Sequence, residues 1–304
     1  MKFVSKLFRK LIYPSDGGNN GQRSDGENDK PGDVANASEG VEDPPPAYNY
    51  RDFQPESSSS SKHQGLVAST PEDPYAFLSF FDTIFLIDDS SSMKGASWHE
   101  VRLALKAIVP KCVAHDADGI DLYFLNYQTK DEGNADQGKA SGGFRNIKMS
   151  ENVGKTFSTV GPRGATFTGQ RLHHILKPHL ELLEQKKDDI DTVKALNIIV
   201  ITDGAANDDV EAPIITAAKK LDKLGAPMHQ LGIQFFQVGN DCGAREALRE
   251  LDDSLGQDLR DIVDTVTWNE GQPGKLTADH ILKVLLGAVV KRLDRKPARG
   301  RGSK

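Results

Sequence analysis

Apolar residues in the central part of this chain follow two patterns. Short continuous apolar runs predict buried strands, and longer segments with an apolar residue every three or four positions predict helices that pack on a sheet. The predicted strands span residues 83–87, 119–126, 144–149, 196–202, 232–239 and 263–268. The predicted helices span residues 97–113, 152–160, 172–183, 209–225, 243–253 and 277–293. Because strands and helices alternate, we expect an α/β domain over residues 71–293 with right-handed parallel crossovers.

Two regions of this domain have sequence features that predict local structure. Residues 128–143 are polar and rich in glycine, which predicts a mobile surface loop. Pro178 should kink the helix in which it lies, because proline has no backbone N–H. The same helix carries His173, His174 and His179, which lack a metal-binding spacing, so we expect them to be ordinary helix and surface histidines.

The two ends of the chain differ from the domain. Residues 1–13 place apolar side chains on one helical stripe opposite basic residues, which is typical of a segment that docks on a membrane surface or a partner. A disordered tail and an organelle presequence are the alternatives. Residues 14–70 have the composition of a disordered linker, and within it Pro45, Pro46 and Tyr48 match the PPxY ligand of WW domains. Residues 294–304 form a basic tail.

Composition narrows the class of protein. The chain has 304 residues, a net charge of −6 and two cysteines that fit neither a disulfide framework nor a zinc site. It has no apolar run of membrane-spanning length and no secretory leader, so we expect a cytoplasmic protein, with peripheral membrane contact through residues 1–13. Basic residues gather at the two ends and leave an acidic body, which argues against nucleic acid as a partner.

Oxygen-bearing side chains follow two of the predicted strands. Asp88, Ser90 and Ser92 alternate directly after one apolar run, and Asp203 follows another. Thr166 lies in a loop before a predicted helix. Ligands of open parallel sheets bind beyond the carboxyl ends of the strands, where these five side chains could converge. Hard oxygen ligands select Mg²⁺, Mn²⁺ or Ca²⁺ over zinc; turn chemistry before a helix is the alternative explanation for Asp-Ser-Ser.

This pattern resembles the von Willebrand factor type A domain with its metal-ion-dependent adhesion site. The matching residues are Asp88-x-Ser90-x-Ser92, Thr166 and Thr202-Asp203-Gly204, within a resemblance that covers about residues 78–290. The segments Pro-Pro-x-Tyr and Asp-Pro-Tyr-Ala-Phe-Leu also resemble intracellular, largely fungal members of this class. One departure is Ser91, where many members have glycine.

The resemblance implies both a fold and a mode of binding. The fold would be a doubly wound, mostly parallel six-stranded sheet with helices on both faces. Ser90, Ser92 and Thr166 would bind Mg²⁺, or Mn²⁺, directly, and Asp88 and Asp203 would act mainly through water. Mg²⁺ requires a further oxygen to complete its octahedron, which an acidic residue of a partner protein can supply.

We therefore expect a metal-dependent protein interaction module and not an enzyme. A ubiquitin-ligase adaptor that acts mainly through the PPxY motif is one alternative. A Mg²⁺-dependent phosphoryl-transfer enzyme is another, since strand-end aspartates can serve that chemistry. The chain has no Gly-rich Lys-Ser/Thr phosphate loop, which argues against the enzyme.

Overall fold

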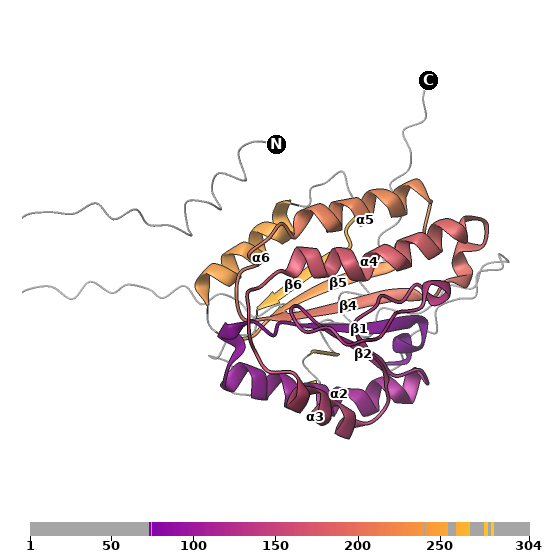
Figure 1. Cartoon of the computed structure of the whole chain (residues 1–304). Coiled ribbons are helices and arrows are strands. Elements are labelled where there is room, and N and C mark those ends of the chain that lie inside the picture. The colour runs from indigo at the N-terminus through magenta and orange to yellow at the C-terminus, as the bar shows by residue number, and fades with distance from the viewer. Residues whose placement is uncertain are drawn as a thin grey trace, which may run out of the picture. The chain divides into compact units, whose positions relative to one another are not determined.

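A single sheet of six strands organises the part of the chain that the computed structural model describes, which is residues 73, 75–239, 241–254, 260–267, 277–278 and 281–282 (Figure 1). The strand order is β3-β2-β1-β4-β5-β6. The strands are β1 Phe81–Ile87, β2 Ile120–Phe124, β3 Phe144–Ile147, β4 Ala195–Thr202, β5 Leu231–Gln237 and β6 Val263–Thr267. Neighbouring strands pair in parallel except β2 and β3, which pair antiparallel. The expected six-stranded, mostly parallel sheet is confirmed.

Helices cover both faces of this sheet. In Figure 1, α2 and α3 lie on one face and α4, α5 and α6 on the other. The helices are α2 Ala96–His115, α3 Ser150–Thr159, α4 Thr168–Gln185, α5 Glu211–Lys223 and α6 Cys242–Ser254, with short 3₁₀ turns at η2 Ala76–Phe80, η3 Ser91–Met93, η4 Ala135–Gln137 and η5 Lys187–Thr192. Each face has its own apolar core, so β1 and β4 are apolar on both sides and nearly every residue in them is buried.

Several sequence predictions fall on residues outside the described part of the chain. These are the amphipathic segment 1–13, the linker 14–70 with Pro45, Pro46 and Tyr48, the basic tail 294–304 and most of the last helix, of which only 278 and 281–282 are described as helical. None of the helices searched in the described residues is both long enough and apolar enough to cross a membrane.

In the described helices, α2 and α4 each contain a proline beyond their first turn, and neither helix ends there. Pro178 lies inside α4, which continues as an α-helix to Gln185; the kink expected at this residue stays a prediction. Pro110 lies inside α2 and cannot donate a hydrogen bond to the carbonyl of Lys106 one turn earlier. The Ser150 hydroxyl at the start of α3 donates to this carbonyl at 2.6 Å. A side chain from the neighbouring helix thus satisfies the acceptor that proline leaves open.

The polar segment 128–143 is more firmly attached than a mobile surface loop. The Tyr123 hydroxyl donates to the Ala140 carbonyl at 2.8 Å. Arg171 is a buried residue of α4, and its side chain donates to the carbonyls of Phe124 at 2.9 Å and Gly142 at 3.1 Å. Its guanidinium also lies 5.3 Å from the centre of the Tyr123 ring. These contacts fasten the segment to the end of β2 and to α4.

His179 is buried, which corrects its assignment as a surface histidine. Its exposed fraction is 4% and, among the described residues, its Nε2 has no hydrogen-bond partner. Burial lowers the pKa of the imidazole to about 4, against a smaller opposite effect of Asp82. The ring is therefore neutral in the folded protein at pH values where an exposed histidine is already protonated.

This burial predicts an acid-sensitive stability. The folded-state pKa of His179 lies below the ordinary value of 6.5, so the unfolded chain binds the proton more readily. The contribution of the neutral His179 to the free energy of unfolding is therefore complete above pH 6.5 and is lost as the pH falls towards 4. The free energy of unfolding of the wild type should fall between pH 7 and pH 4, and in His179→Leu this fall should be smaller by about 3 kcal/mol. Urea denaturation at the two pH values measures this difference. His173→Leu, at an exposed position of α4, is the control; an equal effect of both substitutions would contradict the prediction.

Candidate metal centre

The two aspartates at strand ends lie on neighbouring central strands. Asp88 follows β1 and Asp203 follows β4, and these strands pair in parallel along their whole length. The Asp88 N–H continues the ladder by donating to the Ile201 carbonyl at 2.8 Å. The strand order reverses between β1 and β4, because the chain adds β2 and β3 on one side and β5 and β6 on the other. Such a switch point is where open α/β sheets bind ligands.

A chain of hydrogen bonds joins four of the five predicted ligands. The Asp88 carboxylate accepts from the Ser90 N–H at 2.8 Å and from the Thr202 hydroxyl at 2.7 Å. The hydroxyls of Ser90 and Ser92 are 2.9 Å apart, and the Ser92 hydroxyl donates to the Asp203 carboxylate at 2.7 Å. Asp88 and Ser90 are buried and Ser92 is exposed. The site is therefore open to solvent on the side of Ser92.

Thr166, the fifth predicted ligand, is positioned through its backbone. Its N–H donates to the Asn207 side chain at 2.8 Å, and its carbonyl accepts from the Asn207 N–H at 2.8 Å. The residue is buried. Within the described chain, the Thr166 hydroxyl makes no hydrogen bond with the other four candidate ligands. The structure thus brings Ser90, Ser92 and Asp203 into direct side-chain contact and holds Thr166 in an adjoining loop.

The hydrogen-bonded oxygens of Ser90, Ser92 and Asp203 are as close together as neighbouring ligands of a small divalent cation. Octahedral Mg²⁺ binds oxygen at about 2.1 Å, which places neighbouring ligand atoms about 3 Å apart. The separations of 2.9 Å between Ser90 and Ser92 and 2.7 Å between Ser92 and Asp203 match this value. Over the described residues there is no group of three or more His, Cys, Asp or Glu side chains placed to hold a metal ion. A cation at this site would therefore depend on the hydroxyl groups as well as on the carboxylates.

Negative charge accumulates around Asp203. Burial raises the pKa of its carboxyl group, repulsion from Asp88 and Asp241 raises it further, and the hydrogen bond from Ser92 opposes this effect. The carboxylate form therefore costs free energy in the absence of a counter-charge. A bound cation would lower that cost.

Asp89 connects the loops of the site and was not identified from the sequence. Its side chain is fully buried and accepts hydrogen bonds from the Asn126 N–H at 2.7 Å, the Asn126 amide at 3.1 Å and the Tyr127 N–H at 2.9 Å. Its carbonyl accepts from the Arg163 N–H at 2.6 Å. Burial raises the pKa of the carboxyl group, and the bonds from Asn126 and Tyr127 oppose that rise. One residue thus joins the ends of β1 and β2 to the loop that carries Thr166.

Asn126 fixes the same loop from the end of β2. Its side-chain amide donates to the Ala165 carbonyl at 3.0 Å. Gly164 has φ +84°, and a Cβ atom there would lie 2.6 Å from the Asn126 amide oxygen, so the close approach requires glycine. The Gly164 carbonyl accepts from the Ser91 N–H at 3.1 Å. The backbone next to Thr166 is therefore held on the side of β1 and β2.

Residues after Asp203 hold the loop from the other side. Besides Asn207, Asp208 accepts hydrogen bonds from the Gly169 and Gln170 N–H groups at 3.0 and 2.7 Å, which caps the start of α4. A Cβ atom at Gly169 would lie 2.0 Å from a backbone oxygen of Asp209, so the two segments touch. The cluster Asn207-Asp208-Asp209 was a visible signal, since such residues cap helices. Asp209 accepts a hydrogen bond from the Ala212 N–H at 3.0 Å in the first turn of α5, the next helix, whereas Asp208 caps α4, the preceding one.

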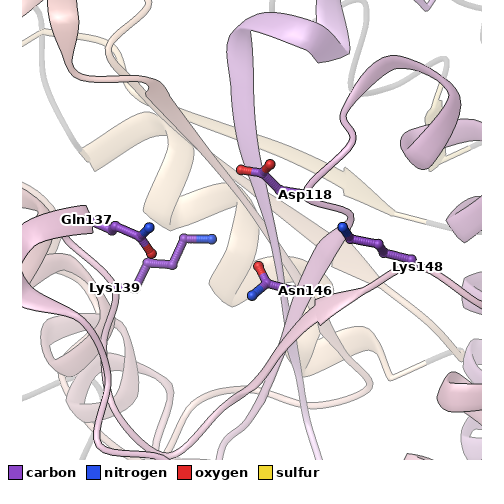
Figure 2. Close-up of a pocket in the computed structure, with 5 residues that line it drawn as sticks. All are labelled: Asp118, Gln137, Lys139, Asn146 and Lys148. Carbon is purple, nitrogen blue, oxygen red and sulfur yellow. The ribbon is translucent and has the colours of Figure 1, made fainter.

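Two surface hollows lie at the opposite end of the sheet. The first, of about 210 Å³, is lined by Asp118, Gln137, Lys139, Asn146 and Lys148 (Figure 2). The second, of about 450 Å³, shares three of these residues and extends to Asp82 and Lys194. Two of the cations are already paired: Lys139 lies 3.3 Å from Asp121, and Lys194 lies within 3.2 Å of both Asp82 and Asp116. These hollows are therefore weaker candidates than the strand ends at Asp88 and Asp203.

Comparison with known proteins identifies the family. Among curated proteins, none matches this chain. Among solved structures, it is similar to the crystal structure of manganese-loaded Plasmodium vivax TRAP protein, with 15% sequence identity and a TM-score of 0.34 over 64% of this chain and 71% of that one. The family model of the von Willebrand factor type A domain matches residues 82–265, which include all five candidate ligands. The match covers the whole six-stranded sheet except the first residue of β1 and the last two residues of β6. The chain therefore belongs to the von Willebrand factor type A domain family.

Proposed function

We propose that this domain binds one Mg²⁺ or Mn²⁺ ion through Ser90, Ser92, Thr166, Asp88 and Asp203, and that the bound ion recruits a carboxylate of a partner protein. The observation that carries the proposal is the continuous contact between the oxygens of Ser90, Ser92 and Asp203 at 2.7–2.9 Å. These separations suit neighbouring ligands of an octahedral cation.

The ligand set explains why a partner's acid would bind. The three hydroxyl groups are neutral, so they leave much of the charge of a divalent ion uncompensated. Each oxygen of the Asp88 carboxylate accepts one hydrogen bond, from the Ser90 N–H and from the Thr202 hydroxyl, so part of its negative charge is already compensated. When bound, the ion supplies the attraction for an external carboxylate. The exposed position of Ser92 provides the route by which that carboxylate arrives.

Binding is preferred to catalysis as the function of the site. Phosphoryl transfer requires groups that hold and neutralise a transferring phosphate, and the chain has no Gly-rich Lys-Ser/Thr loop for that purpose. The candidate ligands, in contrast, form a compact set of oxygen donors. We therefore propose an interaction module and not an enzyme.

Two further parts of the proposal rest on sequence alone. Pro45, Pro46 and Tyr48 would bind a WW domain, and this contact could recruit a ubiquitin ligase. The apolar stripe of residues 1–13 would bind an anionic membrane surface. Neither contact depends on a metal ion, so experiments with a chelator can distinguish both from metal-dependent binding by the domain. Both contacts fit the proposal of a cytoplasmic protein that binds membranes peripherally.

Capture of partners by the full-length protein tests the main proposal. We expect a set of proteins that bind in Mg²⁺ and are lost both in a chelator and with Asp203→Asn in Mg²⁺, since each change removes the charge that attracts the partner's acid. Quantitative mass spectrometry of the three samples measures this. Proteins that bind through the PPxY motif or residues 1–13 should be retained in all three samples. Identical sets in the three samples would refute metal-dependent recruitment.

A further inference from the structure

Phe167 follows the candidate ligand Thr166, at a position where a phenylalanine stabilises neither the start of α4 nor the core. It is the N-cap residue of α4 and makes no capping hydrogen bond, whereas this position ordinarily favours Ser, Thr, Asp or Asn. Asp208 from the neighbouring loop satisfies the first N–H groups of the helix instead. The residue is 43% exposed, so it is not a full member of the core either.

An exposed large apolar side chain is uncommon in the described part of this molecule. Only Leu103, Met149 and Phe167 among the described residues are both large and exposed. Leu103 lies on α2 and Met149 immediately precedes α3, whereas Phe167 follows a candidate metal ligand directly. A partner bound at the metal centre would therefore bring its own side chains within reach of Phe167.

Arg163 lies on the other side of Thr166, in the same loop. It is exposed and forms no ion pair with any of the described residues, although its guanidinium lies 5.9 Å from the centre of the Tyr127 ring. Its backbone N–H is bound to the Asp89 carbonyl at 2.6 Å, so the start of the side chain is fixed beside the site. Of the nearby carboxylates, Asp88 and Asp89 are buried and Asp203 is half-buried. Arg163 thus supplies an exposed positive charge in the loop that carries Thr166, next to a site whose candidate ligands include two carboxylates.

We infer that Arg163 and Phe167 select the residues that flank the partner's metal-binding acid. The inference rests on the proposed function and deepens it. The partner would be a protein segment with an apolar side chain within two residues of that acid, which packs on Phe167, and with a second acidic residue that pairs with Arg163. Charge complementarity supports the second acid, because Arg163 is exposed and forms no ion pair with any of the described residues.

Selection from displayed peptides tests this inference. The probe is a library with a fixed central glutamate and three random residues on each side, presented to the immobilised full-length protein in Mn²⁺. Peptides selected by the wild-type protein should carry an apolar residue within two positions of the glutamate and a second acid. Phe167→Ser should lose the apolar preference, and Arg163→Glu should lose the second acid. Leu103→Ser, a change at an equally exposed apolar residue, should keep both.

Affinities of single peptides give the size of the effect. A peptide with an apolar flank should bind wild-type protein about tenfold more tightly than its serine-flanked counterpart, and this ratio should fall to about twofold or less in Phe167→Ser. Metal-dependent peptides without flank preferences, or identical preferences in Phe167→Ser and wild type, would overturn this inference and leave the proposed function standing. Selection that is unchanged in EDTA, or no selection by the wild type, would overturn the proposed function itself.

Discussion

Ser92→Ala should weaken binding of Mg²⁺ or Mn²⁺ to the full-length protein by roughly 10- to 100-fold. The Ser92 hydroxyl contacts two other candidate ligands, the Ser90 hydroxyl at 2.9 Å and the Asp203 carboxylate at 2.7 Å. Its removal takes away one ligand and one hydrogen bond to the carboxylate. Because Ser92 is exposed, the substitution should leave the fold intact. Isothermal titration calorimetry should find one divalent site per chain in the wild type.

Two further variants make this result specific. Asp203→Asn keeps the shape of the side chain and removes its charge, so it should lower affinity by a similar factor. Asp188→Ala also removes one negative charge, at an exposed position of η5, and should bind metal as the wild type does. Metal binding also raises the apparent stability of the protein that binds it, so Mg²⁺ should raise the melting temperature of the wild type and of Asp188→Ala. Equal affinities in all four proteins would refute the metal centre.

The fold was largely predictable because buried parallel strands appear in sequence as continuous apolar runs. The predicted strand 196–202 and the observed β4 Ala195–Thr202 differ by one residue, and β1 begins two residues before the predicted start at 83. Helical spacing also indicates which face of α4 is buried. Position 179 lies three and four residues after Leu176 and Ile175, on the buried face of α4, so periodicity pointed to a buried His179.

The supporting residues of the site were less predictable, because no periodic pattern marks them. Asp89 bonds residues 37 and 38 positions later, and Asn207 bonds Thr166 from 41 positions away. Such contacts arise when sheet pairing brings strand ends together, and each depends on one side chain. Residue type gave a partial signal, since Asn and Asp at strand ends and before helices commonly bind backbone groups. Which backbone group each one binds required the three-dimensional structure.

Asp89→Ala should lower the free energy of unfolding by about 1–3 kcal/mol, because it leaves N–H donors of the half-buried residues Asn126 and Tyr127 without their buried acceptor. The Thr166 loop is bound to Asp89 and Asn126, so metal affinity should fall as well. Urea denaturation and calorimetry measure the two effects. Asp89→Asn, which retains one acceptor oxygen, should have a smaller effect on stability and provides a folded variant for the metal titration.

Asp118→Ala removes an exposed acid and is the control; its free energy of unfolding should stay within about 0.5 kcal/mol of that of the wild type. Wild-type stability and wild-type metal affinity in both Asp89 variants would show that this residue does not hold the site together.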